Sequence, residues 1–158
     1  MARAIEMAIR FIQEKTLEHG GDLAREVGDY LFHVLYRRDV DYMVLQDPYK
    51  ENSLYKIEAA TPLTYRKLHM WLHASHARWL LEQAGLHPDL PMSKLAEISR
   101  LYEDPDAARA IAVWGEKENV DYHRFCAAVS FWKKKLDDGA DVEDLIRRPE
   151  PETPLPPR

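Results

Sequence analysis

Apolar residues recur every three or four positions along most of the chain, which is the spacing expected of amphipathic helices. In the first such segment the apolar positions are Ile5, Ala8, Ile9 and Ile12. Capping residues, glycines and prolines separate the segments and mark where helices begin and end. From these signals we predict helices over residues 2–18, 23–38, 53–60, 64–84, 93–102, 105–118 and 121–136, with a last short turn from Asp141.

Two segments lack the helical spacing. Residues 39–52 hold a proline among aromatic residues, and we predict either a loop throughout or a loop with one short strand at residues 42–45. Five prolines fall within residues 149–158, which predicts a disordered proline-rich tail. The predicted fold class is therefore all-α: a compact bundle of seven to eight helices in one domain, residues 1–148, followed by this tail.

The length and composition fit one soluble helical domain. The 158 residues are 46% hydrophobic and 31% charged, which is typical of a globular chain. No apolar run approaches the roughly 20 residues of a membrane-spanning helix, and Glu6 and Arg10 interrupt the first segment where a signal peptide would be apolar. A single cysteine, Cys126, suits a reducing compartment. We therefore expect a cytoplasmic protein with no membrane partner.

The distribution of charge singles out one part of the chain. The formal net charge is −5, which argues against a surface that is cationic throughout. Between Glu58 and Glu82 there is no acidic residue, whereas Arg66, Lys67 and Arg78 lie in this interval. The rest of the chain then carries 19 basic and 27 acidic residues, a charge of −8. A local segment without carboxylates favours contact with phosphates.

The same segment holds three of the seven histidines, His69, His73 and His76. On a helix with 3.6 residues per turn they fall within an arc of roughly 60° beside an apolar stripe. Four roles are open: a metal site, a nucleic-acid contact, a pH-dependent switch, or half-buried positions beside the core. The zinc-protease pattern needs glutamate directly after the first histidine, where Met70 stands, so that chemistry is excluded. We predict no metal and no cofactor.

Apolar, serine and aspartate–proline positions keep a regular order across residues 63–129. They are Leu68, Leu72, Ser75, Trp79, Leu90, Ser93, Asp104, Pro105, Tyr122 and Val129. This order resembles the helix-turn-helix region and following helices of the ParB/KorB partition family, in which a second helix reads the major groove of DNA. The resemblance implies a DNA-binding helix-turn-helix with its turn near Ser75.

The chain departs from this family at several points. His69 stands where the family prefers alanine and His73 where it prefers glycine, and residues 1–62 lack the family's nucleotide-binding arginine motifs, so no nucleotide is implied. A second helix-turn-helix frame fits the same region with its turn at residues 61–64. Its four apolar positions are Ile57, Leu63, Leu68 and Trp71. Both frames stay open at the level of the sequence.

These observations together predict a DNA-binding or DNA-associated regulatory protein. The predicted contacts to phosphates or bases are Arg66, Lys67, His69, His73, His76 and Arg78. A homodimer through residues 2–38 would supply a second half-site. The alternative is a helical adaptor without nucleic-acid contact, which binds other proteins through its surface and the proline-rich sequence PLPPR.

Catalysis has little support in the sequence. There is no glycine-rich phosphate loop, no serine in a nucleophile elbow and no cysteine with an activating partner. We therefore predict no enzymatic activity and no catalytic residues. A metal-assisted enzyme built on His69, His73 and His76 is the minority alternative.

Overall fold

Helices account for all the regular structure described in this protein. The structure, a computed structural model, describes residues 2–18, 22–46 and 53–152. These ranges contain α-helices, one π-helical segment and one 3₁₀ segment but no strand. The predicted all-α fold class is thereby confirmed.

The chain divides into two compact units, Met1–His76 and Ala77–Arg158. This division is finer than the single helical domain expected for residues 1–148. Helix α5 (Tyr65–Gln83) begins in the first unit and ends in the second. Each unit has its own buried apolar residues and is described by itself below.

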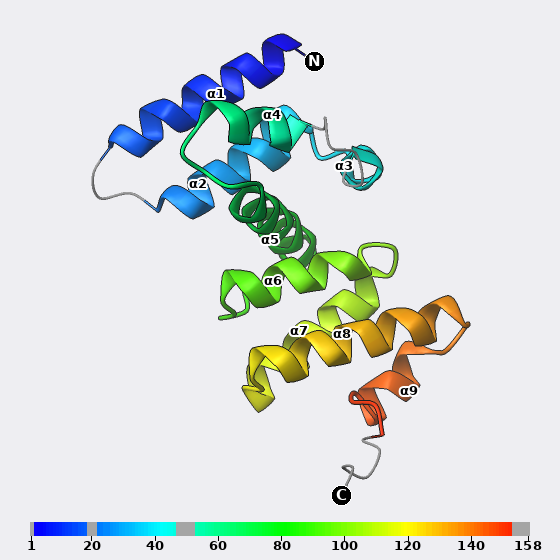
Figure 1. Cartoon of the computed structure of the whole chain (residues 1–158). Helices are drawn as coiled ribbons and strands as arrows, with labels where there is room; N and C mark the ends of the chain where they lie inside the picture. The colour runs from blue at the N-terminus through cyan, green and yellow to red at the C-terminus, as the bar shows by residue number, and fades with distance from the viewer. Residues whose placement is uncertain (1, 19–21, 47–52, 153–158) are drawn as a thin grey trace, which may run out of the picture. The chain divides into compact units, whose positions relative to one another are not determined.

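The first unit begins with α1 (Ala2–Leu17), which lies beside other helices of this unit (Figure 1). This helix contacts α2 (Leu23–Tyr30), the π-helical segment η1 (Leu31–Leu35) that continues it, and α4 (Ser53–Ala60). The buried side of α1 is the apolar stripe predicted from its spacing, with Ile5, Ala8 and Ile12 in the core. The other main core residues of this unit are Val27, Leu31, Phe32, Leu35, Met43, Leu54, Ile57, Leu63, Leu68 and Leu72.

Helix α2 approaches α5 closely at one point within the first unit. Gly28 is buried in α2, and a Cβ atom at this position would lie 2.4 Å from the carbonyl oxygen of Trp71. Real Cβ atoms do not come so close to a backbone oxygen, so only glycine permits this approach of the two helices.

Two side-chain contacts accompany the close approach. The Ser75 hydroxyl donates a hydrogen bond of 2.6 Å to Oδ1 of Asp29. The rings of Phe32 and His76 lie with their centroids 5.2 Å apart. Together with the contact at Gly28 we call these interactions the α2–α5 seam. The seam fixes the orientation of α5 about its own axis within the first unit.

After the end of α5, the described residues of the second unit contain four further α-helices and the 3₁₀ segment η2 (Ser99–Leu101). The helices are α6 (Met92–Ile98), α7 (Pro105–Glu118), α8 (Tyr122–Asp137) and α9 (Val142–Arg147). Helix α8 contacts α6, η2 and α7, and α9 contacts α7 (Figure 1). The largest side chains buried in this core include Trp132, Phe125, Ile98 and Ile111.

Among the described residues of the second unit, Lys94 is a charged side chain that is buried. Lys94 is 7% exposed, its Nζ donates a hydrogen bond to the carbonyl oxygen of Val120, and it lies 5.8 Å from the centroid of the Phe125 ring. Val120 follows the C-terminal end of α7, where the helix dipole favours a cation. The buried ammonium group is therefore stabilised by a carbonyl, a helix end and an aromatic face.

Most capping signals in the sequence act as predicted. The Asp104 carboxylate accepts a hydrogen bond from the backbone N–H of Ala107 at the start of α7, and Asp121 does the same for Arg124 at the start of α8. Thr64 caps α5 through the backbone N–H of Lys67, at 3.2 Å. Short polar side chains at these positions satisfy N–H groups that have no partner within the helix.

The prediction for residues 42–45 was wrong. These residues belong to α3 (Val40–Gln46) and form neither a loop nor a strand. Oδ1 of Asp39 accepts a hydrogen bond of 3.0 Å from the backbone N–H of Tyr42, and Met43 is buried. A capped turn with one buried apolar residue is thus sufficient for a helix too short to show a hydrophobic period.

The helix predicted over residues 23–38 ends before its expected boundary. After Tyr30 the backbone widens into the π-helical segment, so that the N–H of Tyr36 bonds to the carbonyl of Leu31. Arg37 and Arg38 then adopt positive φ angles of 53° and 62°, which end the helix. Because arginine is a good helix former, residue type alone did not reveal this end.

The first residues of the predicted tail are fixed in place. Nε1 of Trp132 donates a hydrogen bond of 2.8 Å to the carbonyl oxygen of Pro149. Arg124 donates two hydrogen bonds, of 2.9 and 2.7 Å, to the carboxylate of Glu150. The remainder of the predicted disordered segment, residues 153–158, lies outside the described residues.

We expect Gly28→Ala to destabilise the first unit. Alanine is favoured over glycine within helices by about 1 kcal/mol, but here its methyl group would collide with the Trp71 carbonyl, and overpacking of this kind costs about 1–3 kcal/mol. Urea unfolding followed by circular dichroism measures the change. Ala59→Gly, at an exposed position of α4, is the control and should lose only the roughly 1 kcal/mol of helix propensity. A stabilised Gly28→Ala protein would contradict the close approach.

Candidate nucleic-acid interface

Helices α4 and α5 are joined by a four-residue turn, residues 61–64. The hydroxyl of Thr61 donates to the carbonyl of Ile57 at 2.9 Å, and the Glu58 carboxylate accepts a 2.5 Å hydrogen bond from the backbone N–H of Tyr65. Ile57, Leu63 and Leu68 are buried on the two sides of this turn. A connection of this length between two helices is one feature that helix-turn-helix pairs share.

The two sequence frames differ in where they place the turn. Helix α5 is continuous from Tyr65 to Gln83, so the backbone has no turn near Ser75. Ser75 is buried and its hydroxyl bonds to Asp29 in the α2–α5 seam. The turn that the backbone does make in this region, at residues 61–64, is at the position used by the second frame.

Two predicted contact residues lie near the N-terminal end of α5. Arg66 and Lys67 are both exposed, and with half-buried Met70 between them they span an arc of about 100° on a helix of 3.6 residues per turn. From residue 53 to residue 76 the single acidic side chain is Glu58, which is half-buried and caps α5. With Lys56 on α4 included, three cations and one carboxylate give this segment a charge of +2.

Two of the predicted histidines form part of a row of rings beside these cations. Tyr55 of α4 stacks on Tyr65 with centroids 4.0 Å apart, Tyr65 lies 5.6 Å from His69, and His69 lies 4.2 Å from His73. All four residues are half-buried. The row connects α4 to α5 across the turn through the contact of Tyr55 with Tyr65.

Sequence reasoning missed the two tyrosines of this row. Tyr65 stands four residues before His69, and a ring at that helical spacing was a detectable signal. Tyr55 lies on another helix, and nothing in the sequence brings its ring onto Tyr65.

The third histidine has a different place. His76 is 1% exposed and packs against Phe32 in the core of the first unit. Burial lowers the pKa of its imidazole to about 4 from the usual 6.5, because the charged form would lose its water. His76 therefore offers no surface to phosphates or bases, and the prediction of a shared histidine face is corrected to His69 and His73 alone.

The last of the six predicted residues belongs to the second unit. Arg78 is half-buried and follows His76 on α5, beyond the boundary between the units. Four of the six predicted residues, Arg66, Lys67, His69 and His73, therefore lie at the surface of the first unit. We call these four residues together with Tyr65 the α5 face.

The α5 face holds no evident metal site. Within the described ranges, no three histidine, cysteine, aspartate or glutamate side chains gather as the ligands of a metal ion would. His69 and His73 make a pair four residues apart, but His76, the third residue of the minority enzyme hypothesis, is in the core.

None of the helices in the described part of the chain is both long and apolar enough to cross a membrane.

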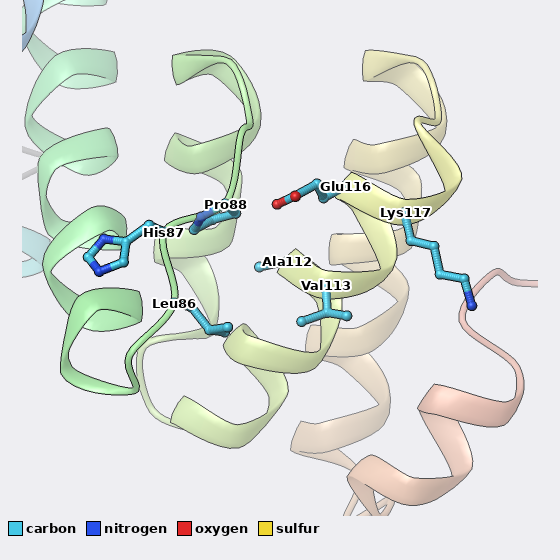
Figure 2. Close-up of a pocket in the computed structure, with 7 residues that line it drawn as sticks. All are labelled: Leu86, His87, Pro88, Ala112, Val113, Glu116 and Lys117. Atoms are coloured by element: carbon cyan, nitrogen blue, oxygen red, sulfur yellow. The ribbon is translucent and has the colours of Figure 1, made fainter.

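A hollow of about 360 Å³ in the second unit offers another place for chemistry (Figure 2). The Glu116 carboxylate accepts a 3.0 Å hydrogen bond from the backbone N–H of Asp89, so it anchors the loop that borders the hollow. Figure 2 shows the His87 ring directed away from Glu116, with Pro88 between them. The two titratable groups are thus not arranged as a pair for proton transfer, which needs hydrogen-bond reach.

The low pKa of His76 predicts a pH-dependent stability. In the unfolded chain the imidazole takes up a proton near pH 6.5, whereas in the folded protein it stays neutral until about pH 4. Stability is therefore fully present above pH 6.5 and is lost as the pH falls toward 4. Between pH 7.5 and 5 the loss from this group is about 2 kcal/mol.

Urea unfolding of wild type and His76→Gln at both pH values tests this expectation. The variant starts from a lower free energy of unfolding but lacks the titrating ring. From pH 7.5 to pH 5 its free energy of unfolding should therefore decrease by about 2 kcal/mol less than that of wild type. His87→Gln, at an exposed position, is the control and should behave as wild type. An identical decrease in wild type and His76→Gln would contradict the burial of a neutral imidazole.

Comparison with known proteins assigns no family to this chain. No protein-family model, curated protein or solved structure matches it. The resemblance to the ParB/KorB family therefore rests on the residues named above, and the proposal that follows rests on the α4–turn–α5 geometry and its charges.

Proposed function

We propose that the first unit is a DNA-binding module of a regulatory protein, with α4 and α5 as its helix-turn-helix and α5 as the helix that enters the major groove. The observation that carries this proposal is the position of Arg66 and Lys67. Both are exposed within the first turn of a helix that directly follows a four-residue turn. In helix-turn-helix proteins the N-terminal residues of the second helix reach the base edges.

The shape of α5 suits such a contact. The major groove of B-DNA is about 12 Å wide and admits one α-helix. The side of α5 that carries Leu68 and Leu72 is buried in the first unit, which leaves Arg66 and Lys67 on the outside. An arginine there can make two hydrogen bonds to a guanine, and a lysine can neutralise a phosphate.

The row of rings gives the α5 face a second kind of contact. His69 and His73 lie one and two turns further along α5 than Tyr65, on the flank next to Arg66. Imidazole N–H groups donate hydrogen bonds to phosphate oxygens or to base acceptors. In this proposal the histidines assist the two cations and do not replace them.

A regulator of this kind ordinarily binds as a dimer with two half-sites. The expected dimer contact within residues 2–38 is part of the proposal. Helix α1 lies within this range, and its residues Met7 and Leu17 are 51% and 80% exposed.

The α5 face should bind DNA with a strong dependence on salt. We expect the wild-type chain to retard a duplex of random sequence at low salt, and the double variant Arg66→Glu/Lys67→Glu to lose most of this affinity. If the two cations neutralise two phosphates, the slope of log K against log salt, which is negative, becomes less steep by about 2 in the variant. Fluorescence anisotropy at several salt concentrations measures both quantities.

A charge-matched variant controls for net charge. Lys133→Glu/Lys134→Glu on α8 of the second unit changes the charge by the same amount outside the α5 face. It should retain nearly the full affinity and slope. If wild type fails to bind any duplex at low salt, or if both double variants lose affinity equally, the proposal is wrong and the adaptor alternative gains weight.

A further inference from the structure

A groove lies between α7 and α9 in the second unit, with a volume of about 690 Å³. Val113 and Ile146 line it with 51% and 50% of their surfaces exposed, and half-buried Trp114 and Pro149 extend its apolar lining. Val113 also lines the neighbouring hollow of Figure 2, so the apolar surface continues beyond the groove. Exposed apolar side chains that gather in a hollow of this size are typical of binding sites. We call it the α7–α9 groove.

We propose that the α7–α9 groove binds the proline-rich segment 151–158 of a second copy of this chain. The inference is independent of DNA binding, because none of the residues that line the groove belongs to the α5 face. If each copy gives its segment to the other, the contact closes as a symmetric pair. The groove would then provide a second connection between copies, in addition to α1.

The segment PETPLPPR fits the groove in its chemistry. Its prolines favour the polyproline II conformation, which loses little entropy on binding and is recognised by grooves with aromatic walls. Trp114 supplies an aromatic wall here. The exposed surfaces of Val113 and Ile146 offer apolar contact to Leu155, the single large apolar residue of the segment.

The charges of the groove suit the arginine at the end of this segment. Three acidic and two basic side chains line it: Asp106, Glu118, Glu143, Arg109 and Lys117. Within the described part of the chain, neither Asp106 nor Glu143 forms an ion pair. Either carboxylate can therefore accept a charge-assisted hydrogen bond from Arg158 of the bound segment.

Opposite sides of α9 line two different hollows. Toward the α7–α9 groove it contributes Val142, Glu143 and Ile146. A second hollow, of about 460 Å³, is lined by Asp144, Leu145 and Arg148, which lie roughly half a turn around the helix from the first set. Glu150 and Glu152 also line this second hollow.

This course of the chain favours a second copy as the source of the bound segment. Beyond Pro149, Arg124 holds the Glu150 carboxylate, and Glu152 lies at the hollow on the other side of α9 from the groove. Residues 153–158 span about 19 Å as polyproline II. To occupy its own groove the segment would have to reverse its direction around α9 within that length, whereas a segment from another molecule enters without this reversal.

A synthetic peptide of residues 149–158 tests the groove directly. Its partner is the chain shortened to end at Glu152, which keeps every described residue. We expect saturable binding of the peptide by fluorescence anisotropy. Val113→Asp or Ile146→Asp should weaken this binding at least about tenfold, because a carboxylate at the apolar contact must give up its water when the peptide binds. Both positions are half exposed, so these variants should keep their fold, which circular dichroism checks. Val44→Asp, at a position 42% exposed outside the groove, is the matched control and should bind as wild type.

The full-length chain provides the second measurement. Sedimentation velocity over a series of concentrations should show association that is weakened in Ile146→Asp and in Leu155→Asp but not in Val44→Asp. No peptide binding, or equal binding by Val113→Asp and wild type, would overturn the proposed site. A full-length chain that stays monomeric and excludes the peptide would place the segment in its own groove and would overturn the role of the second copy.

Discussion

The close approach of α2 to α5 at Gly28 is the constraint on which the rest of the first unit depends. Because no side chain separates Gly28 from the Trp71 backbone, the two helices lie near enough for Asp29 to reach Ser75 and for Phe32 to cover His76. These contacts fix which side of α5 is buried. The opposite side, with Arg66 and Lys67 near its start, is left at the surface as a consequence.

The seam also separates the three histidines into two environments. His76 is enclosed on the α2 side of α5, where the imidazole is held neutral by its lack of water. His69 and His73 lie nearer the N-terminal end of the helix, in a row of rings that reaches Tyr55 on α4. Residues that share an arc of one helix therefore lie in different environments, because Phe32 covers α5 only near His76.

Much of the fold could be predicted from the sequence because its signals are local. The aspartates that cap α7 and α8, the threonine that caps α5 and the apolar stripe of α1 all act through residues within one or two turns. The π-helical segment η1 and helix α3 were not predicted. The first depends on how the helix fits its surroundings, and the second is only seven residues long.

The candidate site shows the same division between local and distant information. The exposed cations and the start of α5 follow from the capping threonine and the absence of acids in the sequence. The burial of His76 could not be predicted, since it depends on Phe32, forty-four positions earlier in the chain. The choice between the two turn positions had a sequence signal after all: no glycine or proline interrupts residues 65–83, where α5 runs without a break.

The central claim is that the exposed N-terminal end of α5 contacts DNA, and a nuclear magnetic resonance titration with a short duplex tests it most directly. Amide signals of residues 64–70 and the ring signals of His69 and His73 should shift together and saturate with one binding constant. Signals of α7 and α9 should stay in place, since those helices carry no residue of the α5 face. Shifts confined to the second unit, or no shifts at low salt, would contradict the account.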